Sequence, residues 1–156
     1  ITLMSLNKTF NFPGAGLGWM ICKNNSLREM ASHRIGSLVP HPDIFGYIAT
    51  DAAIKYGEDW RLALLDYLSQ NRKLLIQRIN QIPGLSLYDI EASYLGWISC
   101  EKLPVKNPHQ LFLNHGVALQ PGIMFNQPNH IRINIATPQS LLKKALDRIE
   151  IAVKSI

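Results

Sequence analysis

The first nineteen residues constrain the fold of this chain more than any other stretch. They begin with a short apolar run, Ile1 to Met4, which predicts a buried strand, and a polar cluster with Ser5 and Lys8 follows at once. A glycine-rich loop at residues 14–18 leads into a second apolar run. A lysine between a buried strand and such a loop can lose hydration, which lowers the cost of the neutral amine that attacks an aldehyde. A hydroxyl at the same turn can hydrogen-bond a phosphate.

The same segment admits three other interpretations. S-x-x-K is also the nucleophile motif of penicillin-binding enzymes, but the K-T-G motif that should accompany it is absent, because Phe10 follows Lys8 and Thr9. The G-x-G-x-G pattern is not the dinucleotide-binding fingerprint and lacks a complete βαβ unit. The third interpretation is a surface lysine near a turn, which four residues alone do not exclude.

Composition narrows the class of protein. At 156 residues the chain is long enough for one domain, or for one domain and part of another. Hydrophobic residues make up 47% and charged residues 17%, which favours a folded chain with a core over a disordered one. No apolar run approaches the ~20 residues of a membrane span. The sequence opens inside a strand-like run, so we expect it to be a piece of a longer, cytoplasmic protein.

Charge and cysteine content exclude further classes. The net charge is +5, but the basic residues are scattered and form no stripe interleaved with aromatic side chains, so we expect no nucleic-acid partner. The two cysteines, Cys22 and Cys100, lie in apolar settings and are expected to be reduced thiols. Neither they nor the five histidines have metal-site spacing, and each histidine is predicted to be a cap or a surface residue.

Hydrophobic periodicity and capping residues predict the elements. Ser26 with Glu29 three residues later has the pattern of a capping box, which predicts a helix to about Ile35. The longest periodic stretch, residues 58–81, predicts a helix that a Pro-Gly pair ends. The other expected elements are a strand at 17–22, a helix at 43–56, strands at 85–88 and 93–100, a helix at 107–115, a strand at 116–119, a turn at 120–122, a strand at 130–136 and a helix to about 153 with Thr137 as cap.

This order of elements predicts an α/β chain in two parts. Strand and helices come first, then one long helix, then a ββαββα arrangement. We interpret residues 1–57 as the tail of a large α/β domain. Residues 58–156 are then a linking helix and a small α+β domain.

The strand at residues 130–136 carries a second candidate group. Alternation places Arg132 and Asn134 on one face and three isoleucines on the other. A guanidinium on a rigid strand can hold a carboxylate with two parallel hydrogen bonds. A surface arginine on an edge strand is the other interpretation.

Both segments resemble a known family. The first, S-x-x-K-T-F-N followed by a glycine-leucine turn, is similar to the cofactor-lysine segment of the pyridoxal-phosphate-dependent aminotransferase class I/II superfamily (fold type I), and most of all to its cystathionine β-lyase or C–S lyase branch. The second, G-V-A-L-Q-P-G and then R-I-N-I-A-T-P, resembles the substrate-carboxylate segment. The resemblance implies that Lys8 is the Schiff-base lysine, Ser5 a phosphate ligand and Arg132 the ligand of the amino-acid carboxylate.

The resemblance also implies an activity, a cofactor and an assembly. The chain would be the C-terminal portion of a homodimeric pyridoxal 5'-phosphate enzyme acting on amino acids. The lyase branch eliminates a thiol and yields pyruvate and ammonia; an aminotransferase is the alternative, and a non-catalytic binding or regulatory domain that kept the fold is a third. Some aminotransferases have an arginine eight residues after the lysine, where this chain has Gly16, which favours the lyase branch.

Several family parts lie upstream of the lysine, and only seven residues precede Lys8. They are the aspartate paired with the pyridine nitrogen, the aromatic residue that stacks on the ring and the first phosphate-binding loop. We therefore expect these 156 residues alone to bind the cofactor poorly and to have no useful turnover.

Other polar and aromatic residues are assigned to structure. Trp97 lies in an apolar strand and is predicted to be core, and Tyr94 is predicted to be packing. Thr9 and Asn11 flank the candidate lysine, where turn chemistry explains them as well as a role in orienting it.

Overall fold

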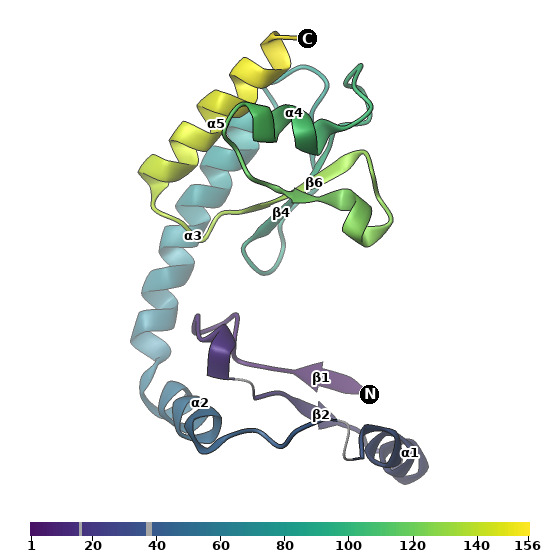
Figure 1. The fold of residues 1–156 in the computed structure, drawn as a ribbon. Coiled ribbons are helices and arrows are strands. Elements are labelled where there is room, and N and C mark those ends of the chain that lie inside the picture. The colour runs from purple at the N-terminus through teal and green to yellow at the C-terminus, as the bar shows by residue number, and fades with distance from the viewer. Residues whose placement is uncertain (16, 37–38) are drawn as a thin grey trace. The chain divides into compact units, whose positions relative to one another are not determined.

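The computed structural model describes residues 1–15, 17–36 and 39–156 (Figure 1). The chain is a mixed α/β protein that divides into two compact units, residues 1–63 and residues 64–156. Each unit is described by itself. The boundary lies inside the long helix, whereas the sequence predicts a division just before that helix.

The first unit contains a two-stranded ribbon and two helices. Strand β1 (Thr2–Met4) pairs antiparallel with β2 (Trp19–Ile21), and a short 3-10 helix, η1 (Pro13–Ala15), lies in the connection. Both predicted strands are present, but the burial predicted for the first is wrong, since Leu3 is 76% exposed. The second strand is no better covered, with Ile21 51% exposed. The ribbon has only two strands, so the described residues offer its apolar side chains little to pack against.

The two helices of this unit begin at side-chain caps. Helix α1 (Asn25–Ile35) is capped by Asn24, whose side-chain oxygen accepts the Leu27 N–H at 3.0 Å. The predicted capping box of Ser26 and Glu29 is therefore wrong, because the helix begins at Asn25 with Asn24 as its cap, and Ser26 already lies inside it. Helix α2 (Ile44–Tyr56) begins at Asp43 in the same way, as the sequence predicts.

The second unit is a four-stranded antiparallel sheet with helices. Its strand order is β3-β4-β6-β5. Helices α3 and α5 lie side by side, joined by ion pairs from Arg78 to Asp147 and Glu150 (Figure 1). The elements are α3 (Glu58–Ile79, which begins in the first unit), β3 (Ser86–Leu87), β4 (Leu95–Ser99), α4 (Pro108–Asn114), β5 (Gln120–Pro121), η2 (Gly122–Phe125), β6 (His130–Asn134) and α5 (Gln139–Lys154).

One face of this sheet forms the core. Ile98 on β4 and Ile131 on β6 are directly opposite each other and fully buried, together with Leu75 of α3 and Leu146 of α5. The opposite face carries Trp97, Arg132 and Gln120 in one cross-strand row, since Arg132 pairs with both neighbours. The alternation predicted for the strand at 130–136 is confirmed.

Two predicted details of the second unit are wrong. The strand expected at residues 116–119 is absent, because Gly116 has a φ of 75° and the Val117 N–H bonds back to the Phe112 carbonyl, so this segment ends α4. The strand instead forms at residues 120–121, where a turn was predicted. Thr137 is no cap either: the hydroxyl of Tyr67 accepts the Gln139 N–H at 2.8 Å.

A buried amide ties α3 to the end of β6. Asn71 is fully buried, and its Nδ2 donates to the carbonyls of Ile135 and Thr137, both at 2.9 Å. These carbonyls follow the strand that carries Arg132, so one side chain fixes where that strand ends. Among the helices in the described ranges, none is long and apolar enough to cross a membrane.

Candidate active site

The loop after β1 is shaped by backbone hydrogen bonds that bracket Lys8. The Phe10 N–H donates to the Leu6 carbonyl at 3.0 Å, and the Phe12 N–H donates to the Asn7 carbonyl at 3.1 Å. Asn11 has a φ of 55°, a left-handed conformation that asparagine tolerates better than most residues. Lys8 is thus presented from a tight, defined turn.

Aromatic packing holds this turn in place. The ring of Phe10 stacks on Phe12 at 6.3 Å and on Trp60 at 6.2 Å between centroids. Its edge also covers Gly57, where an added Cβ would lie 2.5 Å from Phe10 Cε1. A glycine is needed there because of this close approach.

Within this loop Lys8 and Ser5 differ in what they contact. Lys8 is exposed, and its amine has no hydrogen-bond or ion-pair partner among the residues that the structure describes. The Ser5 hydroxyl donates to the Leu17 carbonyl at 3.0 Å and accepts the Asn7 N–H at 3.2 Å. The Lys8 amine is therefore accessible, but in these residues it keeps the hydration that the sequence predicts it to lose. The serine must rotate its hydroxyl before it can donate to a phosphate. Gly16, the position at which some aminotransferases have an arginine, lies outside the described residues.

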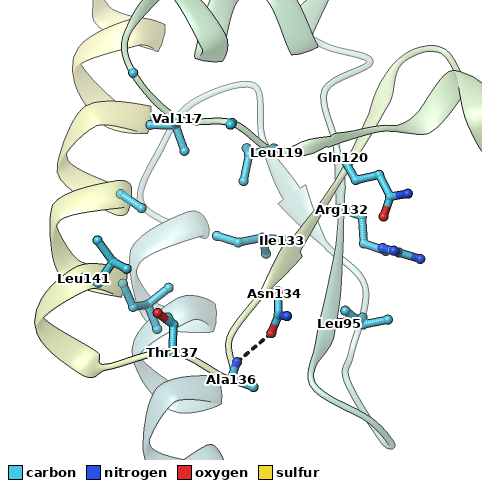
Figure 2. Close-up of a pocket in the computed structure, with 14 residues that line it drawn as sticks. Leu95, Val117, Leu119, Gln120, Arg132, Ile133, Asn134, Ala136, Thr137 and Leu141 are labelled. Carbon is cyan, nitrogen blue, oxygen red and sulfur yellow. Dashed lines mark hydrogen bonds between the residues drawn. The ribbon is translucent and has the colours of Figure 1, made fainter. Parts of the chain in front are cut away.

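Arg132 lies on the sheet face opposite the core, half-buried between Trp97 and Gln120. Its Cζ is 4.9 Å from the centroid of the Phe125 ring. No carboxylate pairs with it in the described part of the chain. Figure 2 shows Arg132 and Gln120 side by side, pointing away from Ile133 and Leu119.

A pocket of about 540 Å³ adjoins this arginine. It lies between the segment 116–120, strand β6 and the start of α5, and Arg132, Gln120 and Asn134 are among its polar lining residues (Figure 2). The Asn134 side chain accepts the Ala136 N–H at 2.8 Å. Arg132 is thus the charged donor of this pocket, and the amides of Gln120 and Asn134 and the Thr137 hydroxyl are neutral donors beside it.

Four rings line up beside the arginine; we call Tyr88, His130, Trp97 and Phe125 the ring stack. His130 stacks on Trp97 at 5.5 Å and on Tyr88 at 5.9 Å. Trp97 meets Phe125 edge to face at 5.4 Å and 89°. The ring stack therefore runs along the sheet face and ends at Arg132.

The ring stack corrects two sequence predictions. Trp97 is not part of the hydrophobic core but is half-buried on the other face, because it pairs with Arg132 and not with an isoleucine. His130 is not a surface residue: it is 4% exposed, and its Nδ1 has no partner among the described groups. Alternation from Arg132 back to His130 would have placed the histidine on this face, whereas Phe125 gives no such signal because it ends a 3-10 helix.

The remaining candidates have structural roles or stay outside both sites. His115 ends α4 and its Nδ1–H donates to the Leu111 carbonyl at 2.8 Å, and Tyr94 packs against the core as predicted. Burial raises the pKa of the Cys100 thiol to about 12, so this cysteine is a poor nucleophile. Within residues 1–15, 17–36 and 39–156 no group of histidine, cysteine and carboxylate side chains is arranged to hold a metal ion.

The predicted site residues thus fall into two groups. Ser5 and Lys8 share one loop of the first unit, and Arg132 lies with Gln120 and Phe125 in the second unit. A cofactor that carries an aldehyde and a phosphate suits the first group, and a carboxylate suits the second.

Comparison with known proteins tests these assignments at the level of the family. A family model for aminotransferase class I and II matches residues 1–149. A Mycobacterium leprae protein whose name proposes a cystathionine beta-lyase is 31% identical over 96% of this chain and 44% of its own length.

Solved structures agree over nearly the whole chain. The crystal structure of OvoB matches 99% of it with a TM-score of 0.94 and 38% identity, over 41% of that protein. The C-S lyase of Staphylococcus hominis, solved with bound PLP, matches 97% of it with a TM-score of 0.83 and 30% identity, over 38% of that protein. The chain therefore spans about two-fifths of the length of these relatives. Family model, relatives and fold agree with the resemblance in the sequence: the chain belongs to the aminotransferase class I and II family.

Proposed function

We propose that this chain is part of a pyridoxal 5'-phosphate enzyme that eliminates a thiol from the β-carbon of an amino acid, as a C–S lyase. The similarity to the PLP-bound lyase of Staphylococcus hominis and to the Mycobacterium leprae relative supports this assignment. The single observation that carries it is the unpaired guanidinium of Arg132 on a rigid strand beside a pocket. Such a group suits a ligand carboxylate, because none of its donors is used within the described chain.

Lys8 and Ser5 are the residues that would hold the cofactor. The free amine of Lys8 fits attachment of an aldehyde, and Ser5 fits a phosphate once its hydroxyl turns from the Leu17 carbonyl. When bound, the cofactor supplies an electron-withdrawing ring that makes the substrate Cα–H acidic. The Lys8 amine then takes the Cα proton as a general base, and the thiolate leaves from Cβ. Hydrolysis of the remainder gives pyruvate and ammonia.

Arg132 would fix the substrate during this step. Two parallel N–H donors gripping the α-carboxylate restrict rotation about Cα, which keeps the bond to be broken in one orientation. The substrate is thus expected to be an amino acid with a thiol or thioether at Cβ. We expect the full-length protein to be a homodimer, and this chain alone to bind the cofactor weakly.

The decisive experiment is borohydride reduction of the full-length protein after incubation with pyridoxal phosphate. Reduction makes the lysine–cofactor bond permanent, so mass spectrometry of peptides locates it. We expect the label on Lys8, no label in Lys8→Arg, and a normal label in the matched control Lys23→Arg, since Lys23 lies in the turn before α1. A label on a different lysine contradicts the role of Lys8, and no label in the wild type contradicts the whole proposal and leaves a non-catalytic role.

An aminotransferase is the second candidate, which the name of the family model supports. In that case the Lys8 amine would pass the Cα proton on instead of keeping it, and no thiol would leave. Incubating the full-length protein with cystathionine or cystine and no oxo-acid separates the two. Pyruvate release without an acceptor is expected for a lyase; no pyruvate, with transfer of the amino group to an added oxo-acid acceptor, indicates an aminotransferase.

A further inference from the structure

The ring stack ends on the arginine that the proposed function assigns to the substrate carboxylate. We propose that Phe125 is a positioning residue for Arg132: its ring holds the guanidinium in place, and Trp97 and His130 hold that ring. This inference rests on the proposed function, because it deepens the role of Arg132.

The contact between the Arg132 guanidinium and the Phe125 ring suits a positioning role, because it leaves the N–H donors of the arginine unused. A cation over a ring face is attracted by the negative charge of that face, and no N–H is consumed. An internal carboxylate would restrain the guanidinium equally well but would occupy the same edge that a substrate carboxylate needs. In the described structure Arg132 has the ring and has no such carboxylate.

The backbone fixes where the ring lies. Phe125 is the last residue of η2, and Asn126 follows in a left-handed conformation with its N–H on the carbonyls of Gly122 and Ile123. Gly122 packs directly against the returning chain, because a Cβ there would lie 2.1 Å from the Gln127 carbonyl oxygen and 2.4 Å from that of His130. The turn that presents Phe125 is therefore closely packed.

Behind Phe125 the other rings limit its motion. The edge-to-face contact with Trp97 suits the charge distribution of two rings, and His130 lies parallel to Trp97 at 14°. His130 is buried and Trp97 is half-buried, so the stack rests on the sheet. Phe125 itself is 42% exposed, which is far more than a ring needed only for the core would be.

A structural readout tests the contact in this chain directly. In the 156-residue protein the Phe125 ring current is expected to shift the NMR signals of the Arg132 side chain upfield. Phe125→Leu should move these signals toward those of a free arginine, while Ile123→Leu, at an exposed position of the same 3-10 helix, should leave them unchanged. Arg132 signals that do not move in Phe125→Leu overturn the inference.

Kinetics of the full-length enzyme with cystathionine test the consequence. Phe125→Leu should raise KM about fivefold with little change in kcat, because a looser guanidinium weakens carboxylate binding. Phe125→Tyr keeps the ring and should restore KM, and Ile123→Leu should match the wild type. An unchanged KM in Phe125→Leu, or a Phe125→Tyr enzyme as weak as Phe125→Leu, contradicts positioning through the ring.

The variant Arg132→Lys distinguishes a failure of the further inference from a failure of the proposed function. If it raises KM and Phe125→Leu does not, the further inference fails and the proposed function stands. If Arg132→Lys leaves KM unchanged, the arginine does not hold the carboxylate and the proposed function itself fails at this residue. Equal thermal stability of all variants is the control that excludes unfolding as the cause.

Discussion

The two units of this chain use apolar residues in opposite ways. Every buried apolar side chain of the second unit belongs to one core, which begins at Leu68 and includes both central strands and α5. Among the described residues of the first unit, only Gly46 and Thr50 are buried. Helix α2 shows the contrast most clearly, since Phe45 is 75% exposed and Ile48 is 58% exposed.

This difference shows that hydrophobic content does not by itself predict a core. Helix α5 alternates charged and apolar residues, so it has one side for the core and one for water. Helix α2 is apolar on most sides, a pattern typical of a helix covered all round, yet its side chains stay exposed here. Within these 156 residues, stability is thus expected to come from the second unit.

The largest expected effect comes from cutting the chain before α3. A polypeptide of residues 58–156 retains the entire core and should unfold cooperatively, whereas residues 1–57 should show no transition, because little burial offsets their ordering entropy. Circular dichroism during heating and hydrogen exchange measure both. Cooperative unfolding of 1–57 alone would contradict the comparison, and the same experiment tests the predicted domain division at residue 57.

A matched pair of helical isoleucines sharpens the comparison. Ile149 on α5 is fully buried and Ile48 on α2 is 58% exposed. Ile149→Ala should lower the free energy of unfolding by about 2–5 kcal/mol, because it leaves a cavity, and Ile48→Ala by less than about 0.5 kcal/mol. Urea unfolding of the 156-residue chain measures both values. Similar losses in the two variants would mean that both units carry a core.

The buried amide of the second unit should have a smaller effect. Asn71→Ala removes the donor of one buried and one part-buried carbonyl and should cost about 1–3 kcal/mol. Gln70→Ala, at the exposed neighbouring position of the same helix, is the matched control and should cost less than about 0.5 kcal/mol. If both variants unfold at the same urea concentration, the amide does not secure the end of β6.

Cys100 gives an effect that depends on pH and is small over the range from pH 8 to pH 10. Burial raises the pKa of Cys100 to about 12, so above pH ~9 the unfolded chain loses this proton while the folded chain keeps it. Stability should therefore fall as the pH rises from 9 toward 12, by up to about 1.4 kcal/mol per pH unit from this group. Urea unfolding at pH 8 and pH 10 measures the loss, which should be smaller in Cys100→Ala.

Alkylation at pH 8 compares the two thiols of the chain without unfolding the protein. Cys22 in the first unit is only half-buried, so iodoacetamide should modify it first, and Cys100 only when the second unit opens. Equal rates for both thiols would contradict the burial of Cys100.

The sequence predicts most elements of both units. Strong periodicity gives α3 and α5, and alternation gives β6, because a buried face demands a regular pattern. The position of β5 is predicted wrongly, because the Val117 N–H bonds to the Phe112 carbonyl at the end of α4 and not to a neighbouring strand. The exposure of the β1–β2 ribbon is not predicted, because an apolar strand pattern does not show which other elements pack against the strand.

The residues of the candidate site also differ in whether the sequence predicts them. Lys8, Ser5 and Arg132 are proposed from motifs that are continuous in sequence. The ring stack is not, because its members come from four separate segments and meet only when β4 and β6 pair and η2 folds back. Contacts across strands of this kind depend on register, which periodicity alone does not fix at a turn.

The tight packing at Gly122 limits how this region can vary during evolution. Any side chain there would collide with two backbone carbonyls, whereas Ile123 and Met124 are 61% and 66% exposed and are free to drift. Descendants of this gene can therefore exchange the residues that project from the turn while its path stays the same.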